Sequence, residues 1–293
     1  MNAQAVASPA LKPKDYKSAA HPTWCPGCGD FGVLSALYQA MAQLGLELDK
    51  TVVVSGIGCS SRLPFFVKTY GFHGCHGRAL PTALGIKVAR PDLNVIVTGG
   101  DGDGFSIGAG HVPHIARKNV DVTYVVMDNR IYGLTKGQVS PTSHLGFVAT
   151  TTPYGSLDEP VDPVTFSIVY GATFVARGFS AERNHLADLI VRGVQHKGFS
   201  IIDVVSTCPI FNKDDTFDYY KPLVKKIDDS HDPTNKGKAL ELAMSTSTDG
   251  KVPIGVYYEV KTPTLGERLE GLKRANKGSD TLDISAVLDT FKV

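Results

Sequence analysis

Two cysteines in a turn of proline and glycine open the organised part of the chain, in the stretch HPTWCPGCGD at residues 21–30. The spacing of Cys25 and Cys28 suits a zinc ion, an iron–sulfur cluster or a disulfide. The other cysteines lie singly at positions 59, 75 and 208, so the second C-x-x-C knuckle of a zinc ribbon is missing. The N-terminus shows no export signal, which predicts reduced cytoplasmic thiols and makes the disulfide the least favoured of the three.

A run of glycines and aspartates, GGDGDG at residues 99–104, follows an apolar stretch and precedes a helix-like pattern. Glycine lets the backbone approach an anion closely, and a helix N-terminus offers free N–H groups to a phosphate. Carboxylates in the same loop repel a bare phosphate, so Asp101 indicates a divalent cation between the two. Asn129 ends the next apolar stretch, and its amide oxygen adds a ligand that suits octahedral Mg²⁺. A nicotinamide-binding turn is disfavoured, because no spaced G-x-G-x-x-G with a later acidic residue occurs.

Alternating helix and strand signals supply the frame for these residues. Short apolar runs predict strands, and stretches with a helical apolar stripe predict helices between them. This alternation predicts an α/β fold with a doubly wound, mostly parallel sheet. Because the carboxyl ends of parallel strands share one edge of the sheet, we expect the loops that follow them to meet there. The expected strands are 51–56, 93–100, 120–129, 172–176, 199–205 and 252–260, and the expected helices are 30–45, 78–91, 108–119, 181–198 and 238–245.

We divide the chain into a lead-in with the cysteine pair (residues 1–29), a main domain (30–210) and a C-terminal extension (211–293) that packs on the main domain or on a partner. The first twenty residues are expected to be a mobile lead-in, and Asp30 is expected to be the N-cap of the first helix. Lys and Arg number 30 against 29 Asp and Glu, so no overall field favours nucleic acid or an anionic membrane. No apolar run is long enough to span a bilayer.

Taken together, the motifs WCPGCGD, GIGCSSR, HGRALPTALGIK, GGDGDG and YGLTKGQVSPTS resemble the β subunit of the 2-oxoacid:ferredoxin oxidoreductases, most closely the 2-oxoglutarate type. The resemblance extends over residues 20–215. It implies a thiamine diphosphate-binding fold with Mg²⁺ and one [4Fe–4S] cluster. The implied reaction is oxidative decarboxylation of a 2-oxoacid with coenzyme A, or its reverse, with electrons passed to ferredoxin. The alternatives are a pyruvate or broad-range enzyme of this family, a non-redox thiamine diphosphate carboligase or decarboxylase, and a zinc-bearing binding module.

The resemblance also implies roles for individual residues. It assigns the side chains of Asp101 and Asn129 and the backbone oxygen of Ile131 as the Mg²⁺ ligands. Asp103 is the alternative to Asp101 as the carboxylate ligand. The implied cluster ligands are Cys25, Cys28, Cys59 and Cys208, and Cys75 is left as a buried free thiol. Read without the resemblance, Cys59 and Cys208 are small residues of the core, and His76 caps a helix. The implied contacts to thiamine diphosphate are Ile57, Gly58, Cys59, Ser60, His76, Gly102, Asp103, Gly133 and Leu134.

Two cations are expected near the reacting carbon. Arg62 follows Cys59 by three residues, and Lys136 lies in the stretch GLTKG. A second carboxylate on the substrate would use both cations, which favours 2-oxoglutarate over pyruvate. The alternative is that both are ordinary surface charges or contacts to the cofactor phosphates.

A glutamate that activates the cofactor is missing from the expected site. Thiamine enzymes resemble one another in using such a glutamate on the aminopyrimidine ring, normally from a second domain. Residues 1–150 contain one glutamate, Glu47. It precedes the first expected strand, at the edge of the sheet opposite the expected cofactor site. Glu159 and Glu182 are not aimed at the cofactor, and Glu259 or Glu267 of the extension are the remaining internal candidates. We therefore expect half an active site, completed by an α subunit that carries the pyrimidine-binding domain.

Overall fold

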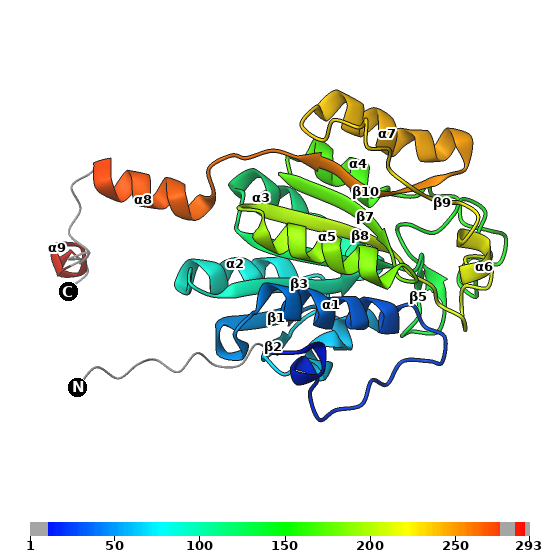
Figure 1. The fold of residues 1–293 in the computed structure, drawn as a ribbon, viewed down its shortest axis with the longest axis horizontal. Coiled ribbons are helices and arrows are strands. Elements are labelled where there is room, and N and C mark those ends of the chain that lie inside the picture. The colour runs from blue at the N-terminus through cyan, green and yellow to red at the C-terminus, as the bar shows by residue number, and fades with distance from the viewer. Residues whose placement is uncertain (1–10, 276–284, 291–293) are drawn as a thin grey trace.

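An eight-stranded β-sheet forms the centre of the molecule in the computed structural model, which describes residues 11–275 and 285–290. Its strands lie in the order β2-β1-β3-β4-β8-β7-β10-β9 (Figure 1). The strands from β2 to β7 in that order run parallel, whereas β10 runs antiparallel to β7. The strands of this sheet are β1 (Thr51–Ser55), β2 (Tyr70–His73), β3 (Asn94–Gly100), β4 (Val122–Asp128), β7 (Phe174–Phe179), β8 (Phe199–Val205), β9 (Val224–Lys226) and β10 (Val252–Glu259).

Helices cover both faces of the sheet, because the side chains of each strand alternate between the faces and both faces are apolar. In β4, Val125 and Met127 contact one helical layer, whereas Tyr124 and Val126 contact the other. The predicted doubly wound, mostly parallel sheet is therefore confirmed. One layer contains α1 (Asp30–Leu44) and α5 (Arg183–Gln195), and the other contains α2 (Ala79–Ala89), α3 (His111–Lys118), α4 (Pro163–Val169) and α7 (Lys236–Asp249).

The expectation of a mobile lead-in is wrong for residues 11–20. Tyr16, at the end of the short helix η1 (Pro13–Tyr16), is fully buried. Its hydroxyl lies 3.0 Å from the backbone oxygen of Met41 and 2.8 Å from that of Leu46, so this segment is fixed to the end of α1. Ser18 also donates hydrogen bonds to the backbone oxygens of Phe65 and Phe66. The polar residues around Tyr16 conceal these anchors in the sequence. Residues 1–10 lie outside the described part of the chain.

The N-cap of α1 is Gly29, not Asp30 as expected. A Cβ on Gly29 would lie 2.3 Å from Ser206 Oγ, and one on Gly32 would lie 2.0 Å from the backbone oxygen of Ser180. Only glycine therefore lets the start of α1 pack so closely against the ends of β7 and β8. This close approach turns the Asp30 side chain inward, where it is fully buried.

The C-terminal extension contributes to the main sheet. β10 pairs with β7 along one side and with β9 along the other, and Ala239 and Ala243 of α7 join the core beside α4. The expected helix at 238–245 is longer than predicted, since α7 spans Lys236–Asp249. Beyond β10, α8 (Leu265–Ala275) leads away from the sheet (Figure 1). In the described ranges, no helix has the length and apolar character needed to cross a membrane.

Candidate active site at the carboxyl edge of the sheet

The loops that follow β1, β2 and β3 meet around one buried carboxylate, Asp103, at the start of a π-helical turn (Asp103–Ile107). Asp103 Oδ1 accepts hydrogen bonds from the backbone N–H groups of Ile57 at 2.9 Å and Gly77 at 2.8 Å, and lies 2.9 Å from His76 Nδ1. The adjoining Gly56 is required, because a Cβ there would lie 2.2 Å from Asp103 Oδ2. Asp103 therefore organises the loops on which Ile57 and His76 lie.

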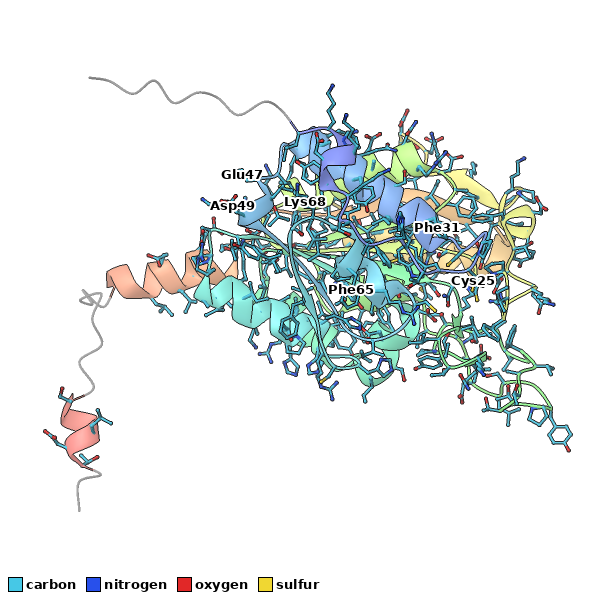
Figure 2. The ribbon with its side chains drawn as sticks, turned by 90° about the horizontal axis from the view of Figure 1, so that it is seen from below. Cys25, Phe31, Glu47, Asp49, Phe65 and Lys68 are labelled. Carbon is cyan, nitrogen blue, oxygen red and sulfur yellow. The ribbon has the colours of Figure 1, made fainter. Side chains whose placement is uncertain are left out.

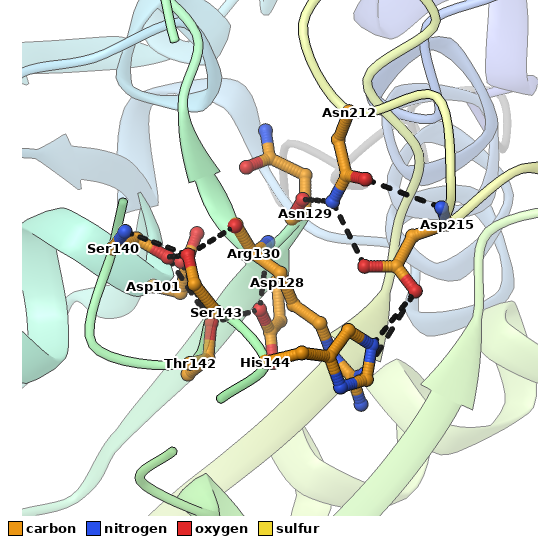
Figure 3. A network of polar contacts seen from close by, with 10 residues as sticks. All are labelled: Asp101, Asp128, Asn129, Arg130, Ser140, Thr142, Ser143, His144, Asn212 and Asp215. Atoms are coloured by element: carbon orange, nitrogen blue, oxygen red, sulfur yellow. Dashed lines mark hydrogen bonds and ion pairs between the residues drawn. The ribbon is translucent and has the colours of Figure 1, made fainter. Parts of the chain in front are cut away.

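A pair of buried carboxylates, Asp101 and Asp128, lies where β3 and β4 end. Thr142 Oγ1 is 2.8 Å from Asp101 Oδ2 and 2.7 Å from Asp128 Oδ1 (Figure 3). One hydroxyl carries one hydrogen, so it donates to only one of these carboxylates at a time. Burial raises the pKa of Asp101 to about 6, and burial together with the charge of Asp101 raises that of Asp128 to about 7. Arg130 lowers the pKa of Asp128 but does not offset burial, so the arrangement suits an added cation beside Asp101.

The turn after β4, residues 128–131, has an unusual backbone conformation. We call this segment the metal turn, because two of the expected Mg²⁺ ligands, Asn129 and Ile131, lie in it. Arg130 has a backbone φ of +57°, in the left-handed region that residues other than glycine and asparagine rarely adopt. The Arg130 N–H donates to Asp128 Oδ1 at 3.1 Å, and its backbone oxygen accepts from Ser143 Oγ at 2.6 Å. Within the same turn, Asn129 Oδ1 accepts from the N–H of Ile131 at 3.1 Å. The backbone of Asn129 interacts with the Asp101 carboxylate, and Ile131 lies two residues further along the same turn. The oxygen donors of these three residues are of the kind that Mg²⁺ prefers.

The structure brings four of the five cysteines together beside this turn. A Cβ on Gly133 would lie 3.4 Å from Cys208 Sγ and 3.7 Å from Cys59 Sγ. The C-x-x-C turn joins the same region, since the N–H of Gly29 donates to the backbone oxygen of Thr207 at 3.0 Å. Burial raises the pKa values of the Cys28 and Cys59 thiols, and both rise further through Asp30 and Cys208. Cys25 raises that of Cys59 as well, so the four thiols lie within electrostatic reach of one another.

Cys75 lies on a different loop from the other four cysteines, the one after β2. Like Cys25 it is exposed, so the expectation of a buried free thiol is wrong. The short strand β2 lies at the edge of the sheet with all of its residues exposed, so the loop after it has nothing to cover it.

No three His, Cys, Asp or Glu side chains among the described residues are grouped as ligands of a single metal ion. A [4Fe–4S] cluster makes a different demand, because each of its four thiolates binds a different iron atom. The cluster itself occupies the space between the thiolates. Gly133 lies directly beside the Cys59 and Cys208 thiols.

Asp30 is a site residue that the sequence analysis did not assign. Its carboxyl is fully buried, with Oδ1 3.4 Å from Ser206 Oγ and Oδ2 without a hydrogen-bond partner. Burial raises its pKa to about 7. The motif WCPGCGD could have predicted this role, because Asp30 is only two residues after Cys28 and must lie near its thiol.

The two expected substrate cations lie on loops next to the cysteines. Arg62, in the helical turn η3 (Ser60–Phe66), is half-buried; its Nη1 lies 3.2 Å from Thr23 Oγ1 and its charge lowers the pKa of Cys59. Lys136 is exposed, with φ +77°, in the turn between β5 (Ile131–Tyr132) and β6 (Gln138–Val139). Its N–H donates to the backbone oxygen of Gly133 at 3.1 Å, which connects it to the cysteine region.

The remaining predicted contact residues share the carboxyl edge but differ in exposure. Ile57 and Leu134 are exposed apolar side chains there, 36% and 40% accessible, and Gly58 borders open space. Gly102 packs against the ring of Tyr132, since a Cβ added to Gly102 would lie 2.2 Å from that ring. Ser60 is buried, and its Oγ faces Gly100 at the end of β3.

None of the glutamates, all of which lie in the described ranges, is held against this site by a contact that we observe. Glu47 precedes β1, and Figure 2 shows it on the opposite side of the molecule from Cys25. Glu259 is paired with Arg192, with 2.8 Å between Oε2 and Nε, and Glu267 accepts from the N–H of Thr264 at 2.7 Å. These contacts engage both of the candidate glutamates of the extension elsewhere. The others are exposed, at positions 159, 182, 241 and 270.

Comparison with known protein families agrees with this fold and site. A family model for the C-terminal thiamine pyrophosphate-binding domain of thiamine pyrophosphate enzymes matches residues 56–204. A second model, for the C-terminal part of the pyruvate ferredoxin oxidoreductase β subunit, matches residues 208–274. The sheet and the loops at its carboxyl edge are therefore those of a thiamine diphosphate-binding domain.

Individual relatives give the family. The chain is 44% identical over 247 residues to the 2-oxoacid:ferredoxin oxidoreductase subunit beta of Saccharolobus solfataricus, covering 80% of this chain and 81% of that protein. It is 39% identical over 267 residues to the 2-oxoglutarate synthase subunit KorB of Methanothermobacter marburgensis, covering 91% and 93%. The structure of the 2-oxoglutarate:ferredoxin oxidoreductase of Magnetococcus marinus, with 2-oxoglutarate, coenzyme A and succinyl-CoA bound, matches with a TM-score of 0.93 and 49% identity over 98% of both chains. This chain belongs to the β subunits of the 2-oxoacid:ferredoxin oxidoreductases, as its motifs predict.

Proposed function

We propose that this chain is the β subunit of a 2-oxoglutarate:ferredoxin oxidoreductase. The enzyme converts 2-oxoglutarate, coenzyme A and oxidised ferredoxin to succinyl-CoA, CO₂ and reduced ferredoxin, or runs in reverse. The observation that carries the proposal is the meeting of Cys25, Cys28, Cys59 and Cys208 beside the metal turn. A non-redox thiamine enzyme has no use for four thiols beside its cofactor.

The metal turn and the Asp103 loops form the cofactor half of the proposed site. Asp101, Asn129 and the backbone oxygen of Ile131 hold Mg²⁺, which binds the diphosphate. The sharing of one Thr142 hydroxyl by two buried carboxylates supports this assignment. When bound, thiamine diphosphate supplies the electron sink for decarboxylation. The residues that line it are Ile57, Gly58, Cys59, Ser60, His76, Gly102, Asp103, Gly133 and Leu134.

The cysteines form the redox half of the proposed site. Forming a thioester from a 2-oxoacid with loss of CO₂ releases two electrons, and ferredoxin accepts them one at a time. A [4Fe–4S] cluster bound to Cys25, Cys28, Cys59 and Cys208 is a one-electron carrier suited to this transfer. Cys59 belongs both to the cluster and to the loop of Ile57, so the two halves of the site share a segment.

The substrate assignment depends on charge. Arg62 and Lys136 lie on loops beside the cysteines, and 2-oxoglutarate carries a second carboxylate that pyruvate lacks. The relatives named as 2-oxoglutarate enzymes support the same choice. The activating glutamate comes from an α subunit with the pyrimidine-binding domain, since the glutamates of this chain are exposed or engaged elsewhere.

A matched pair of cysteine variants tests the proposal. Protein purified without oxygen is expected to contain iron and acid-labile sulfide and to show the broad visible absorption of thiolate-to-iron charge transfer. Cys208→Ser is expected to remove that absorption, whereas Cys75→Ser, on the exposed loop, is expected to retain it. Zinc without sulfide, or loss of the absorption in Cys75→Ser alone, would contradict the ligand assignment. A colourless protein that still decarboxylates its substrate would favour the non-redox thiamine enzyme.

A further inference from the structure

The loop that carries Cys208 is fastened to the metal turn by a buried asparagine. Asn212 is 1% exposed and lies on the loop of residues 206–216, which we call the Cys208 loop. Its Nδ2 donates to the backbone oxygen of Asn129 at 3.1 Å and to Asp215 Oδ2 at 2.8 Å. Its backbone N–H donates to the backbone oxygen of Cys208 at 3.1 Å. One residue thus contacts both a proposed cluster ligand and a proposed Mg²⁺ ligand.

Asp215 connects the same loop to the other side of the metal turn. It is also 1% exposed, and its N–H donates to Asn212 Oδ1 at 3.2 Å. Its Oδ1 lies 3.0 Å from His144 Nε2 and 3.9 Å from Arg130 Nη1 (Figure 3). Although burial raises its pKa, His144, Arg130 and Asn212 outweigh burial and hold the pKa below its usual range. A buried negative charge is thereby fixed between two loops.

These contacts close a ring around the metal turn. His144 is two residues from Thr142, whose hydroxyl reaches Asp101 at 2.8 Å. Ser143, between them, donates to the backbone oxygen of Arg130 at 2.6 Å. The ring therefore passes from Arg130 through Ser143 and His144 to Asp215 (Figure 3). It returns through Asn212 to Asn129, which adjoins Arg130, and Thr142 joins Asp101 to this ring. Buried polar networks in which every member is paired hold a unique geometry.

We propose that Asn212 and Asp215 are positioning residues that set the place of the cluster ligand Cys208 relative to the Mg²⁺-binding turn. Neither residue ligates the metal, the cluster or the cofactor. They fix the Cys208 loop to the metal turn, so that a change in these hydrogen bonds alters both the cluster environment and the affinity for Mg²⁺–thiamine diphosphate. The inference rests on the proposed function, because it takes Cys208 and Asn129 as ligands.

Asn212→Asp is the sharpest test, because it keeps the size of the side chain and removes both N–H donors. The new carboxylate would also face Asp215. We expect unchanged iron and sulfide content, since all four cysteines remain. The affinity for Mg²⁺–thiamine diphosphate is expected to fall about tenfold, as for one lost hydrogen bond at a ligand. In the same protein, the electron paramagnetic resonance spectrum of the reduced cluster is expected to shift.

The measurements use the full chain co-purified with its partner subunit: calorimetry for the cofactor, resonance spectroscopy for the cluster, and thermal unfolding. Asn235→Asp is the matched control, because Asn235 Oδ1 only accepts from the N–H of Lys238 in capping α7, which aspartate also does. Asp215→Asn is a second variant that removes charge but leaves an acceptor for Asn212. It is expected to change the same two properties less strongly, and it decides the question if Asn212→Asp does not fold.

The outcomes are distinguishable. A lower melting temperature with unchanged cofactor affinity and unchanged cluster spectrum would show a structural role only and would overturn the inference. A change in the cofactor affinity without a change in the cluster spectrum, or the reverse, would also overturn it, because the two halves would then be independent. Absence of iron, sulfide or cofactor binding in the unaltered protein would contradict the proposed function itself.

Discussion

A single hydroxyl hydrogen, that of Thr142, faces the buried carboxylates of Asp101 and Asp128. With burial raising their pKa values to about 6 and about 7, the pair holds a proton easily in the absence of a cation. A divalent ion at Asp101 would remove the need for that proton. At the level of residues, the site therefore favours an added positive charge beside Asp101, in addition to that of Arg130, which lowers the pKa of Asp128.

The choice of substrate is also decided by individual residues. Charge-assisted hydrogen bonds from Arg62 and Lys136 to a distal carboxylate are each worth about 1.5–3 kcal/mol. Replacing either by alanine is expected to raise KM for 2-oxoglutarate by about tenfold or more and to spare pyruvate. Steady-state kinetics on both substrates make the comparison. Lys197→Ala, at an exposed lysine just ahead of β8 at the opposite edge of the sheet, is the control.

Equal losses on the two substrates would disprove this assignment of Arg62 and Lys136. They would then act on the cofactor phosphates or on coenzyme A, which both reactions share. Unchanged kinetics in both variants would make them ordinary surface charges.

At the level of elements, the buried strands were predictable, and the exposed strands β2 and β9 were not. The run TVVVSG gave β1 within one residue, because β-branched residues buried on both faces leave a continuous apolar signal. The four residues of β2 are all exposed, so no such signal exists there. The position of β10 beside β7 depends on contacts between residues about eighty positions apart, which local patterns do not record.

The candidate site divides in the same way. The parallel-edge rule was enough to bring Asp101, Asn129 and Cys59 to one edge, because Asp101 and Asn129 directly follow strands and Cys59 lies in the loop after β1. Thr142, Asn212 and Asp215 were missed, since they lie in irregular loops and meet their partners only after folding. The sequence places Asp103 in the loop after β3 but does not predict its hydrogen bonds. Its partners Ile57 and Gly77 contribute backbone N–H groups, which do not depend on residue type.

The junction of α5 and β7 gives a prediction of pH dependence. His196 follows α5 and is buried, with Nε2 2.8 Å from Thr173 Oγ1, just ahead of β7. Burial lowers its pKa, so the folded chain takes up a proton less readily than the unfolded chain, whose histidine titrates near ~6.5. Its contribution to stability is therefore present above that pH and lost as the pH falls through the lower folded pKa.

Thermal unfolding of the wild type and His196→Gln between pH 7.5 and 5 checks this expectation. The melting temperature of the wild type is expected to fall more steeply on acidification, since glutamine does not titrate. Parallel curves for the two proteins would refute it. At pH 7.5 both proteins are expected to bind the cofactor equally, because His196 lies at the edge of the sheet opposite the metal turn.

At the level of the whole molecule, we expect the chain to be half of a catalytic centre. It carries the metal turn, the Asp103 loops and the cysteines, whereas the contacts that we observe for Glu259 and Glu267 lie elsewhere. Purified alone and loaded with its cluster and Mg²⁺–thiamine diphosphate, the chain is expected to leave 2-oxoglutarate unoxidised. Addition of the α subunit is expected to restore turnover, measured as substrate-dependent reduction of ferredoxin. Turnover by this chain as the sole polypeptide would refute the division.

The antiparallel strand β10 has a consequence for how the protein is made. β7 is paired with β8 on one side and β10 on the other, and all of its residues are buried in the finished sheet. During synthesis, that second side stays open until residues 252–259 have left the ribosome, well after every cofactor-binding loop has emerged. An open apolar strand edge pairs readily with other chains. A version truncated after residue 210 would therefore keep every proposed ligand and still precipitate, because the nascent chain gains a soluble surface only when its last strand arrives.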